Sequence, residues 1–590
     1  YAYAQGAAIG VQPYDGETPT RMTAIDRPLD FVMLSDHAEF MGTIAVCNDP
    51  SSPAYDEMQC VDYRDPSLAD LVYFQLNALT GVPPEDVMYP ALCGPDAAYC
   101  IDAGMDVWAG VVDAAEAVYD RTDSCEFTSF AGYEWTSVPL GNNLHRNVMF
   151  KNEKVPEQVY SYFDEPYVEE LWAALQSNCI DRNDGCDVLT IPHNSNLGDD
   201  LFFKDEMANG EPFDEEYVAA RNEMEPIIEV YQHKGASECL PGQPESDELC
   251  GFEIQPFANI AVQNLGVFSE PSPTAYIRSA FGEGMKYEAS LGVNPFQYGL
   301  IGATDTHISA SGMVEEDGFI GHAGSGQSNR ELPPPEGFPD IEYNSPGGLM
   351  GVWAEENART AIFSAVRRKE VFATSGPRIV VRMFGGWDYP SDLCNAEDLA
   401  EQGYAGGVPM GSTLGAQEGA GGPTFVVSAK QDPERTPLQR IQIVKGWLDG
   451  DDYEVAVYEV AGDPDNGAGV DLDTCEPQGE GSPDLCTVWQ DPDFEPGQRA
   501  YYYARVIQNP TCRWTSHQCV EASYDCGDPT REIDLDCCDP ATGLNVDWCE
   551  AIDCSDPGLP PADARCCVPR VEPVIQERAW GSPIWYQPPG

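Results

Sequence analysis

Residues 298–307 read Tyr-Gly-Leu-Ile-Gly-Ala-Thr-Asp-Thr-His and join an apolar run to two side chains that commonly bind metals. The apolar part predicts a buried strand. Asp305 and His307 are two residues apart, so at an extended strand end their side chains point to the same side. A carboxylate and an imidazole therefore converge on one point after this strand.

Three further apolar runs in the first half of the chain lead into His, Asp or Glu. They are residues 31–34 before Asp36 and His37, residues 130–133 before Glu134, and residues 188–191 before His193. In (β/α) barrels the C-terminal ends of the strands carry the catalytic residues. One His after a strand is usually structural, but four such placements in a chain with only seven His residues favour a shared metal site.

Strand-like and helical stretches alternate up to about residue 375. Residues 169–176 and 356–366 have apolar side chains at helical spacing. This alternation predicts an α/β fold, either a barrel or a doubly wound sheet. Insertions rich in Pro, Asp and Cys interrupt it near residues 47–105 and 240–257.

The candidate ligands follow an order that resembles the PHP superfamily, which is named after polymerase and histidinol phosphatase. That order is residues 29–37, Glu134, His145, His193 and residues 305–307. Within the superfamily the chain is most similar to a bacterial family known as domain of unknown function 3604. This likeness covers most of the chain and rests on long stretches: residues 303–307, 351–357, 373–378 and 577–586.

The resemblance implies that residues 1–375 form a distorted (β/α)7-type PHP barrel with disulfide-rich insertions and with metal ions at the C-terminal mouth of its strands. Proteins of this family open with a strand that carries His-x-His, whereas this chain begins at Tyr1 without that motif. The difference indicates either a truncation or an incomplete site. We favour truncation, because the other ligand positions are intact.

The pattern changes after Arg378. Separators rich in Gly, Pro and Asp divide strand-like runs, which predicts a β-rich, sandwich-like accessory region over residues 376–525. Residues 526–590 begin with a Cys- and Asp-rich loop. Their last part, residues 577–586, contains two Trp and is expected to pack back on the barrel.

The candidate metal ligands combine imidazole nitrogens with carboxylate oxygens, a set that favours Zn, Mn or Fe over Ca or Mg. We expect two or three such divalent ions. Two ions about 3.5–4 Å apart can clamp the oxygens of a phosphoryl transfer and generate a hydroxide from bound water. His145 enters the set through the resemblance, since its polar loop alone does not decide its role. The expected ligands are His37, Glu134, His145, His193, Asp305 and His307.

Four further residues are candidates for catalysis. Asp36 is expected to orient the ligands. Glu229 and His233 follow another strand, where His233 either protonates a leaving group or caps a loop. Arg378 either binds a substrate anion or forms an ion pair within the protein.

Two other His residues and one acidic segment have weaker interpretations. His322 is expected on a loop near the mouth, and His517 is expected to be structural. Residues 463–467 and 471–473 resemble loose calcium loops, so a structural Ca is an option besides a solvated acidic turn.

The net charge of −68 is extreme. It argues against nucleic acid and anionic lipid as partners, because both carry negative charge. No apolar run approaches the roughly 18 residues that span a membrane. The expected partner is a small-molecule or polymeric ester substrate, and the oligomeric state stays open.

Twenty-one cysteines are too many for an ordinary cytosolic enzyme. Many are spaced to close local loops, which predicts disulfides and an oxidising compartment, extracellular or periplasmic, with cell-surface attachment as an option. The odd count leaves at least one cysteine without a partner in the chain. The expected pairs are Cys47–Cys60, Cys93–Cys100, Cys179–Cys186, Cys239–Cys250, Cys475–Cys486 and Cys512–Cys519.

Together these features predict a secreted metal-dependent hydrolase. The superfamily resemblance makes a phosphoesterase the leading hypothesis, whereas the residues themselves indicate only metal-assisted hydrolysis. One alternative is an amidohydrolase-like enzyme that uses the same metals. Another is a non-enzymatic extracellular structural or binding protein that retains the fold.

Overall fold

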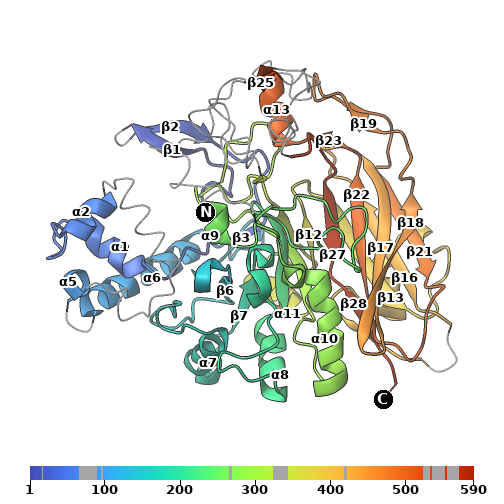
Figure 1. Cartoon of the computed structure of the whole chain (residues 1–590), viewed down its shortest axis with the longest axis horizontal. Coiled ribbons are helices and arrows are strands. Elements are labelled where there is room, and N and C mark those ends of the chain that lie inside the picture. The colour runs from blue at the N-terminus through green and yellow to red at the C-terminus, as the bar shows by residue number, and fades with distance from the viewer. Residues whose placement is uncertain are drawn as a thin grey trace.

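The computed structural model in Figure 1 describes most of the chain. The described residues are 1–15, 18–64, 90–94, 97–264, 269–322, 343–417, 421–521, 532–533, 552–553 and 571–589. Among these residues, none of the helices has both the length and the apolar character needed to cross a membrane.

The strands that carry the predicted ligands lie in three small sheets. β3 (Phe31–Met33) pairs in parallel with β4 (Thr128–Phe130). β5 (Gly132–Trp135), β6 (Arg146–Phe150) and β7 (Val188–Pro192) form an antiparallel sheet. β10 (Gly299–Gly302) pairs in parallel with β8 (Ile227–Gln232), which pairs with β9 (Gly235–Ala236).

The prediction of a (β/α)7-type PHP barrel is therefore wrong. The described strands form several small, mostly antiparallel sheets, and they do not close into a barrel of alternating strands and helices. The connection between β5 and β6 shows one reason. Residues 136–145 contain only the short turn Pro139–Gly141, whereas a parallel crossover needs a dozen or more residues. An apolar run predicts a buried strand but not the direction of its partner.

Helices cover the outer face of these sheets. They are α6 (Ala98–Val118), α7 (Val168–Asn178), α8 (Glu215–Met224), α10 (Ile277–Leu291) and α11 (Arg359–Arg367). In α7 the buried residues Leu171, Trp172 and Leu175 recur at helical spacing. The N-terminus of α8 is capped by Asp214, whose side chain accepts a hydrogen bond from the Tyr217 N–H at 2.8 Å.

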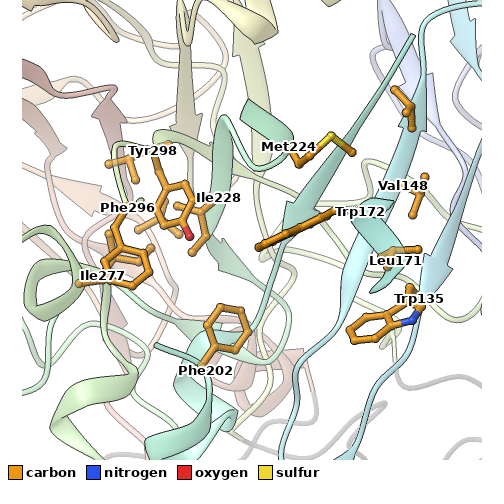
Figure 2. Packing of buried hydrophobic residues seen from close by; sticks show 14 of the residues in the cluster. Trp135, Val148, Leu171, Trp172, Phe202, Met224, Ile228, Ile277, Phe296 and Tyr298 are labelled. Carbon is orange, nitrogen blue, oxygen red and sulfur yellow. The ribbon is translucent and has the colours of Figure 1, made fainter. Parts of the chain in front are cut away.

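The largest core joins these helices to the strands. Figure 2 shows Trp172 of α7 and Met224 of α8 on one side of Ile228 of β8, and Phe296 and Tyr298 on its other side. These side chains are buried. Because this core holds the strands from one side, the strand ends that carry the ligands are fixed in place.

The N-terminal insertion forms a separate helical lobe. α1 (Met41–Asn48), α2 (Met58–Arg64) and α5 (Pro90–Cys93) pack beside α6 at one side of the molecule, in blue in Figure 1. Near it β1 (Ile9–Asp15) and β2 (Thr18–Thr23) form a hairpin. The small core of this lobe contains both of its disulfides.

Two facing sheets form the other side of the molecule (Figure 1). The larger has the order β11-β12-β27-β22-β17-β18 with β15 and β28 attached, and the smaller has the order β14-β13-β16-β21. The strands are β11 (Leu349–Val352), β12 (Val371–Thr374), β13 (Val380–Gly386), β14 (Gly407–Pro409), β15 (Thr413–Gly415), β16 (Thr424–Lys430), β17 (Leu438–Asp449), β18 (Asp452–Gly462), β21 (Asp484–Gln490), β22 (Ala500–Gln508), β27 (Arg578–Gly581) and β28 (Ile584–Gln587).

The larger sheet continues across the predicted domain boundary. β12 comes from the first 375 residues, and it pairs with β27 from the end of the chain. β27 in turn pairs with β22. The segment 577–586 thus lies between the two halves as part of a sheet. Of the predicted Cys-rich loop, residues 526–531, 534–551 and 554–570 lie outside the described residues.

Short elements complete the described chain. They are α9 (Ile260–Asn264), α12 (Leu399–Gly406), α13 (Trp514–Glu521), β19 (Gly469–Val470) with β20 (Pro477–Gln478), β23 (Thr511–Cys512) with β26 (Val574–Ile575), and β24 (Glu532–Ile533) with β25 (Ile552–Asp553).

Four of the predicted disulfides are confirmed: Cys47–Cys60, Cys93–Cys100, Cys179–Cys186 and Cys239–Cys250. The predictions for Cys475–Cys486 and Cys512–Cys519 are wrong, because the structure pairs Cys394 with Cys486 and Cys475 with Cys512. These bonds join elements that only the folded sheets bring together. Cys125 is the free thiol in the described part of the chain.

Candidate metal centre

Glu134 is the centre of a first group of potential metal ligands. Its carboxylate is buried in β5 and faces three imidazoles. Oε1 lies 2.6 Å from Nδ1 of His145 and 3.3 Å from Nε2 of His193, and Oε2 lies 3.3 Å from Nδ1 of His37. One ligand atom each of Glu134, His145 and His193 lies within 4.8 Å of the others, close enough to share an ion.

Strand pairing explains why these residues meet. β6 pairs with both β5 and β7, so His145 before β6 and His193 after β7 reach the same edge as Glu134. A parallel bridge joins His37 to Glu134. The Glu134 N–H donates to the Asp36 carbonyl, and the Ala38 N–H donates to the Glu134 carbonyl, each at 2.9 Å.

A second group contains His233, Asp305 and His307. His233 follows β8 and the other two follow β10, so the parallel pairing of these strands brings their C-terminal ends together. Nε2 of His233 lies 3.7 Å from Oδ2 of Asp305. The rings of His233 and His307 are stacked with centroids 5.7 Å apart.

The two groups are neighbours on one cavity. The ring centroids of His37 and His307 are 5.6 Å apart, which links the groups. The cavity has a volume of about 890 Å³, and its walls include members of both groups as well as Glu229. Apolar side chains line the rest of it, among them Phe31, Met149, Ile301, Met350 and Phe372.

Several nitrogen atoms at the site are buried without a hydrogen-bond partner among the described residues. They are Nε2 of His145 and both ring nitrogens of His233, whereas Nε2 of His193 has the Glu134 carboxylate at 3.3 Å. Such atoms are uncommon in folded proteins and call for a missing partner. A divalent ion at each group would supply that partner, so the residues present fit metal ions.

The electrostatics favour neutral rings at three positions, one of which is His307, where burial lowers the pKa to about 4. Burial lowers the pKa of His145 to about 4, and burial holds the pKa of His233 well below its usual range. Neutral imidazole is the form that binds a metal. Burial would also lower the pKa of His193, but the charge of Glu134 outweighs it and raises that pKa to about 9. A metal ion would have to displace the proton from His193.

The pKa values of two carboxylates at the site, Glu134 and Glu229, shift in opposite directions. Burial would raise the pKa of Glu134, but His37, His145 and His193 hold it well below its usual range. Burial raises the pKa of Glu229 to about 8, and the charge of Asp305 adds to this effect. Glu134 is therefore charged at neutral pH, whereas the unmetallated site keeps a proton on much of Glu229.

Two site residues have an unusual backbone. Asn194, after His193, has φ 51°, and Asp305 has φ 48°. This left-handed region is sparsely populated by residues other than Gly, although Asn and Asp enter it more readily than most. Backbone strain of this kind concentrates at functional sites. Here it turns the chain sharply just where the ligands leave their strands.

One comparison with known proteins identifies a family. The family model described as "Protein of unknown function (DUF3604)" matches residues 1–533. The chain belongs to the DUF3604 family. Comparisons with curated proteins and with solved structures find no match.

In this DUF3604 protein four of the six predicted ligands line the cavity: His37, Glu134, Asp305 and His307. The other two, His145 and His193, contact the Glu134 carboxylate. His233, predicted as a catalytic residue, belongs to the second group. Glu229 lines the cavity, and its Oε1 has no partner in the described structure. The Asp36 side chain is exposed, and it is the backbone carbonyl of Asp36 that contacts Glu134.

Arg378 lies on the cavity wall. Its guanidinium donates to the backbone carbonyls of Arg27 and Pro28, and its N–H donates to Asp432 at 2.7 Å. The guanidinium thus holds the chain near residue 28.

Three other expectations concern residues outside the two groups. His322 lies in a loop and is buried beside His233, with ring centroids 5.7 Å apart. His517 lies 3.9 Å from Asp317, away from the site. In the segment 463–473 the carboxylates of Asp463 and Asp471 accept hydrogen bonds from N–H groups two residues later, as in ordinary acidic turns.

Sequence reasoning missed several polar residues at the site. Gln232 and Lys234 both contact Asp305. The Asn147 side chain lies 3.3 Å from Nδ1 of His193. Their places in the sequence, next to predicted site residues, could have indicated them. Asn147 is two residues after His145, and Gln232 and Lys234 flank His233.

Proposed function

We propose that this DUF3604 protein is a metal-dependent hydrolase that uses metal-activated water, with phosphate esters as the leading substrate class. The observation that carries the proposal is the pair of adjacent His and carboxylate groups on one cavity, with buried ring nitrogens that lack a partner. Structural ion pairs seldom leave such nitrogens unsatisfied.

Each group offers ligands of the type that transition metals prefer. His37, Glu134, His145 and His193 would hold one ion, and His233, Asp305 and His307 would hold another. Mixed nitrogen and oxygen ligands suit Zn, Mn or Fe, and we propose two or three ions in total. Bound metal would supply a nucleophilic hydroxide at neutral pH and stabilise the charge that develops on the ester oxygens.

The chain's own residues prepare this chemistry. Thr136 Oγ1 lies 2.7 Å from Nδ1 of His37 and fixes that ring at the mouth of the cavity. Glu229 lies in the cavity wall with Oε1 free to hold a water or a proton. The apolar wall excludes bulk water and strengthens the electrostatic interactions inside.

The order of the ligands along the chain also supports a relation to the PHP superfamily. That relation would rest on motif order, since the described strands do not form the expected barrel. The disulfides and the charge of −68 are compatible with a secreted protein, extracellular or periplasmic.

The experiment that tests the proposal combines metal analysis with activity. The purified protein is loaded with Zn or Mn, analysed for bound metal, and assayed on an aryl phosphate monoester, a diester, an aryl carboxyl ester and an anilide. Hydrolysis of a phosphate ester that is lost with a chelator and restored by metal supports the proposal. Lys286→Met, which alters an exposed ion pair on α10, is the matched control.

The other outcomes separate the alternatives. Activity on the anilide or carboxyl ester alone would indicate an amidohydrolase-like enzyme. Tight metal binding without any hydrolysis would favour a non-enzymatic binding protein. Absence of bound metal would contradict the proposal as a whole.

A further inference from the structure

We infer that the Lys234 ammonium competes with a divalent metal ion for the Asp305 carboxylate. The ion then binds at His233, Asp305 and His307 only when the ammonium leaves Asp305. The inference rests on the proposed function, since it concerns the regulation of the same metal centre.

The contacts of Asp305 carry the argument. Oδ2 forms an ion pair with Nζ of Lys234. The same oxygen accepts a hydrogen bond from Nε2 of Gln232 at 2.8 Å. This oxygen is thus already occupied by two donors, one of them positively charged. It is also the atom that lies 3.7 Å from the free Nε2 of His233.

Charge makes the ammonium and a metal ion competitors. Asp305 is the single carboxylate of the second group. A divalent ion on Asp305 would lie close to the ammonium, and two cations in a partly buried site repel strongly because little water screens them. The metal must therefore displace Lys234, or Lys234 must move before the metal arrives.

The local backbone allows that movement without any change of fold. Lys234 lies in the tight turn between β8 and β9, where Gly235 has φ 95°. Its carbonyl accepts a hydrogen bond from Nδ2 of Asn196 at 3.0 Å, and its N–H donates to the Gln232 side chain. The backbone is thus held, while the long side chain has rotatable bonds and is 13% exposed.

The first group contains no such cation. In the described structure the ion pairs of Glu134 are with His37, His145 and His193. His residues can lose their protons to become ligands, whereas a Lys cannot serve as a comparable ligand while charged. We therefore expect the two groups to fill in order, the first before the second.

The test measures metal binding. Wild-type protein stripped of metal is titrated with Zn²⁺ by calorimetry, and bound zinc is counted by elemental analysis after dialysis. Wild type should hold one tight ion at the first group and a weaker one at the second. Lys234→Met should bind the second ion at least tenfold more tightly, with the first unchanged. Lys234→Arg, which keeps the charge, should behave like wild type.

Further variants locate the effect. Adding His307→Ala to Lys234→Met should remove the tighter second ion. Lys286→Met should change neither ion. Circular dichroism checks the fold, and Lys234→Gln replaces Lys234→Met if the latter does not fold.

Two results would overturn the inference. One is an equal affinity for the second ion in wild type and in the neutral variants. The other is anomalous scattering from zinc at the second group of wild-type crystals with Lys234 still on Asp305. Failure of every variant to bind even the first ion would instead contradict the proposed function.

Discussion

Two buried carboxylates, Glu134 and Glu238, have opposite surroundings. Glu238 accepts hydrogen bonds from Arg278, Arg505, Tyr503 and Trp580, and all four donors are buried. Glu134 faces three His rings, and one of them, His145, keeps a buried nitrogen without a partner among the described residues.

The difference distinguishes a carboxylate with a structural role from one that is available to bind a ligand. The Glu238 network joins the loop after β9 to α10, β22 and β27. It therefore connects the part of the chain that carries the metal centre to the larger sheet. Its acceptors and donors are matched, which leaves nothing for a ligand. At Glu134 the unmatched groups cost stability unless an ion satisfies them. One carboxylate therefore stabilises the fold, and the other is available for function.

The largest expected effect is the loss of stability when the Glu238 network is broken. Glu238→Gln removes one of the two carboxylates that pair with Arg278 and Arg505, the other being Asp247. Loss of one partner of a buried pair typically costs about 3–5 kcal/mol. Urea unfolding should show this loss. Glu283→Gln, at an exposed ion pair with Lys286, should cost at most about 1 kcal/mol. Equal losses in the two variants would remove the distinction drawn here.

The next effect concerns activity at the metal centre. Asp305→Ala removes the carboxylate of the second group. Hydrolysis of an activated phosphate ester should fall by about 10²–10³-fold, the scale of about 2.7–4 kcal/mol lost with a positioned electrostatic group. Urea unfolding of the metal-free protein should also show a loss, because the variant leaves the partly buried Lys234 ammonium without its carboxylate partner. Full activity in this variant would show that the second group is not needed.

Removing the disulfide Cys394–Cys486 tests the stability of the two facing sheets separately from the metal centre. The disulfide closes a span of 92 residues between the short helical turn Leu393–Asn395 and β21. Replacing both cysteines with Ser should reduce the free energy of unfolding by about 2–4 kcal/mol. Metal content and activity at 25 °C should stay unchanged. A loss of bound metal would mean that the two halves are more tightly coupled than the contacts indicate.

Smaller shifts should appear in the pH dependence of stability. Burial and the charge of Glu316 raise the pKa of Glu577 well above its usual range. A raised pKa in the folded state stabilises below the unfolded value of about 4.3, and this contribution is lost as pH rises. Glu577→Gln should therefore flatten the fall in the urea midpoint above pH ~4.3.

Glu238 should act in the opposite direction. Burial would raise its pKa, but Arg505 and Arg278 hold it well below its usual range. Its contribution is present above pH ~4.3 and is lost only as pH falls further. A midpoint of Glu238→Gln that tracks wild type in acid and neutral solution alike would contradict this assignment.

The smallest effect is expected at His517. This residue lies away from both groups, 3.9 Å from an exposed Asp317. His517→Ala should leave metal content unchanged and the hydrolysis rate within about twofold, because exposed ion pairs contribute little. A marked loss of activity would place part of the function outside the proposed centre.

The sequence by itself determined much of the site. A short apolar run followed by His, Asp or Glu predicts a strand end with a ligand, and that information lies within a few neighbouring residues. His37, Glu134, His193, Asp305 and His307 were found in this way. The helix around Trp172 and the four short-range disulfides are equally local, because helical spacing and short loops need no knowledge of distant chain.

Only the tertiary structure decided what depends on distant partners. It set β6 antiparallel between β5 and β7, inserted β27 between β12 and β22, and paired Cys394 with Cys486. It also placed the Lys234 ammonium on Asp305, 71 residues away. Packing of the whole chain determines strand direction, sheet order and the ion pairs at the site. A local sequence pattern therefore predicts which residues belong to the site but not which residues they contact.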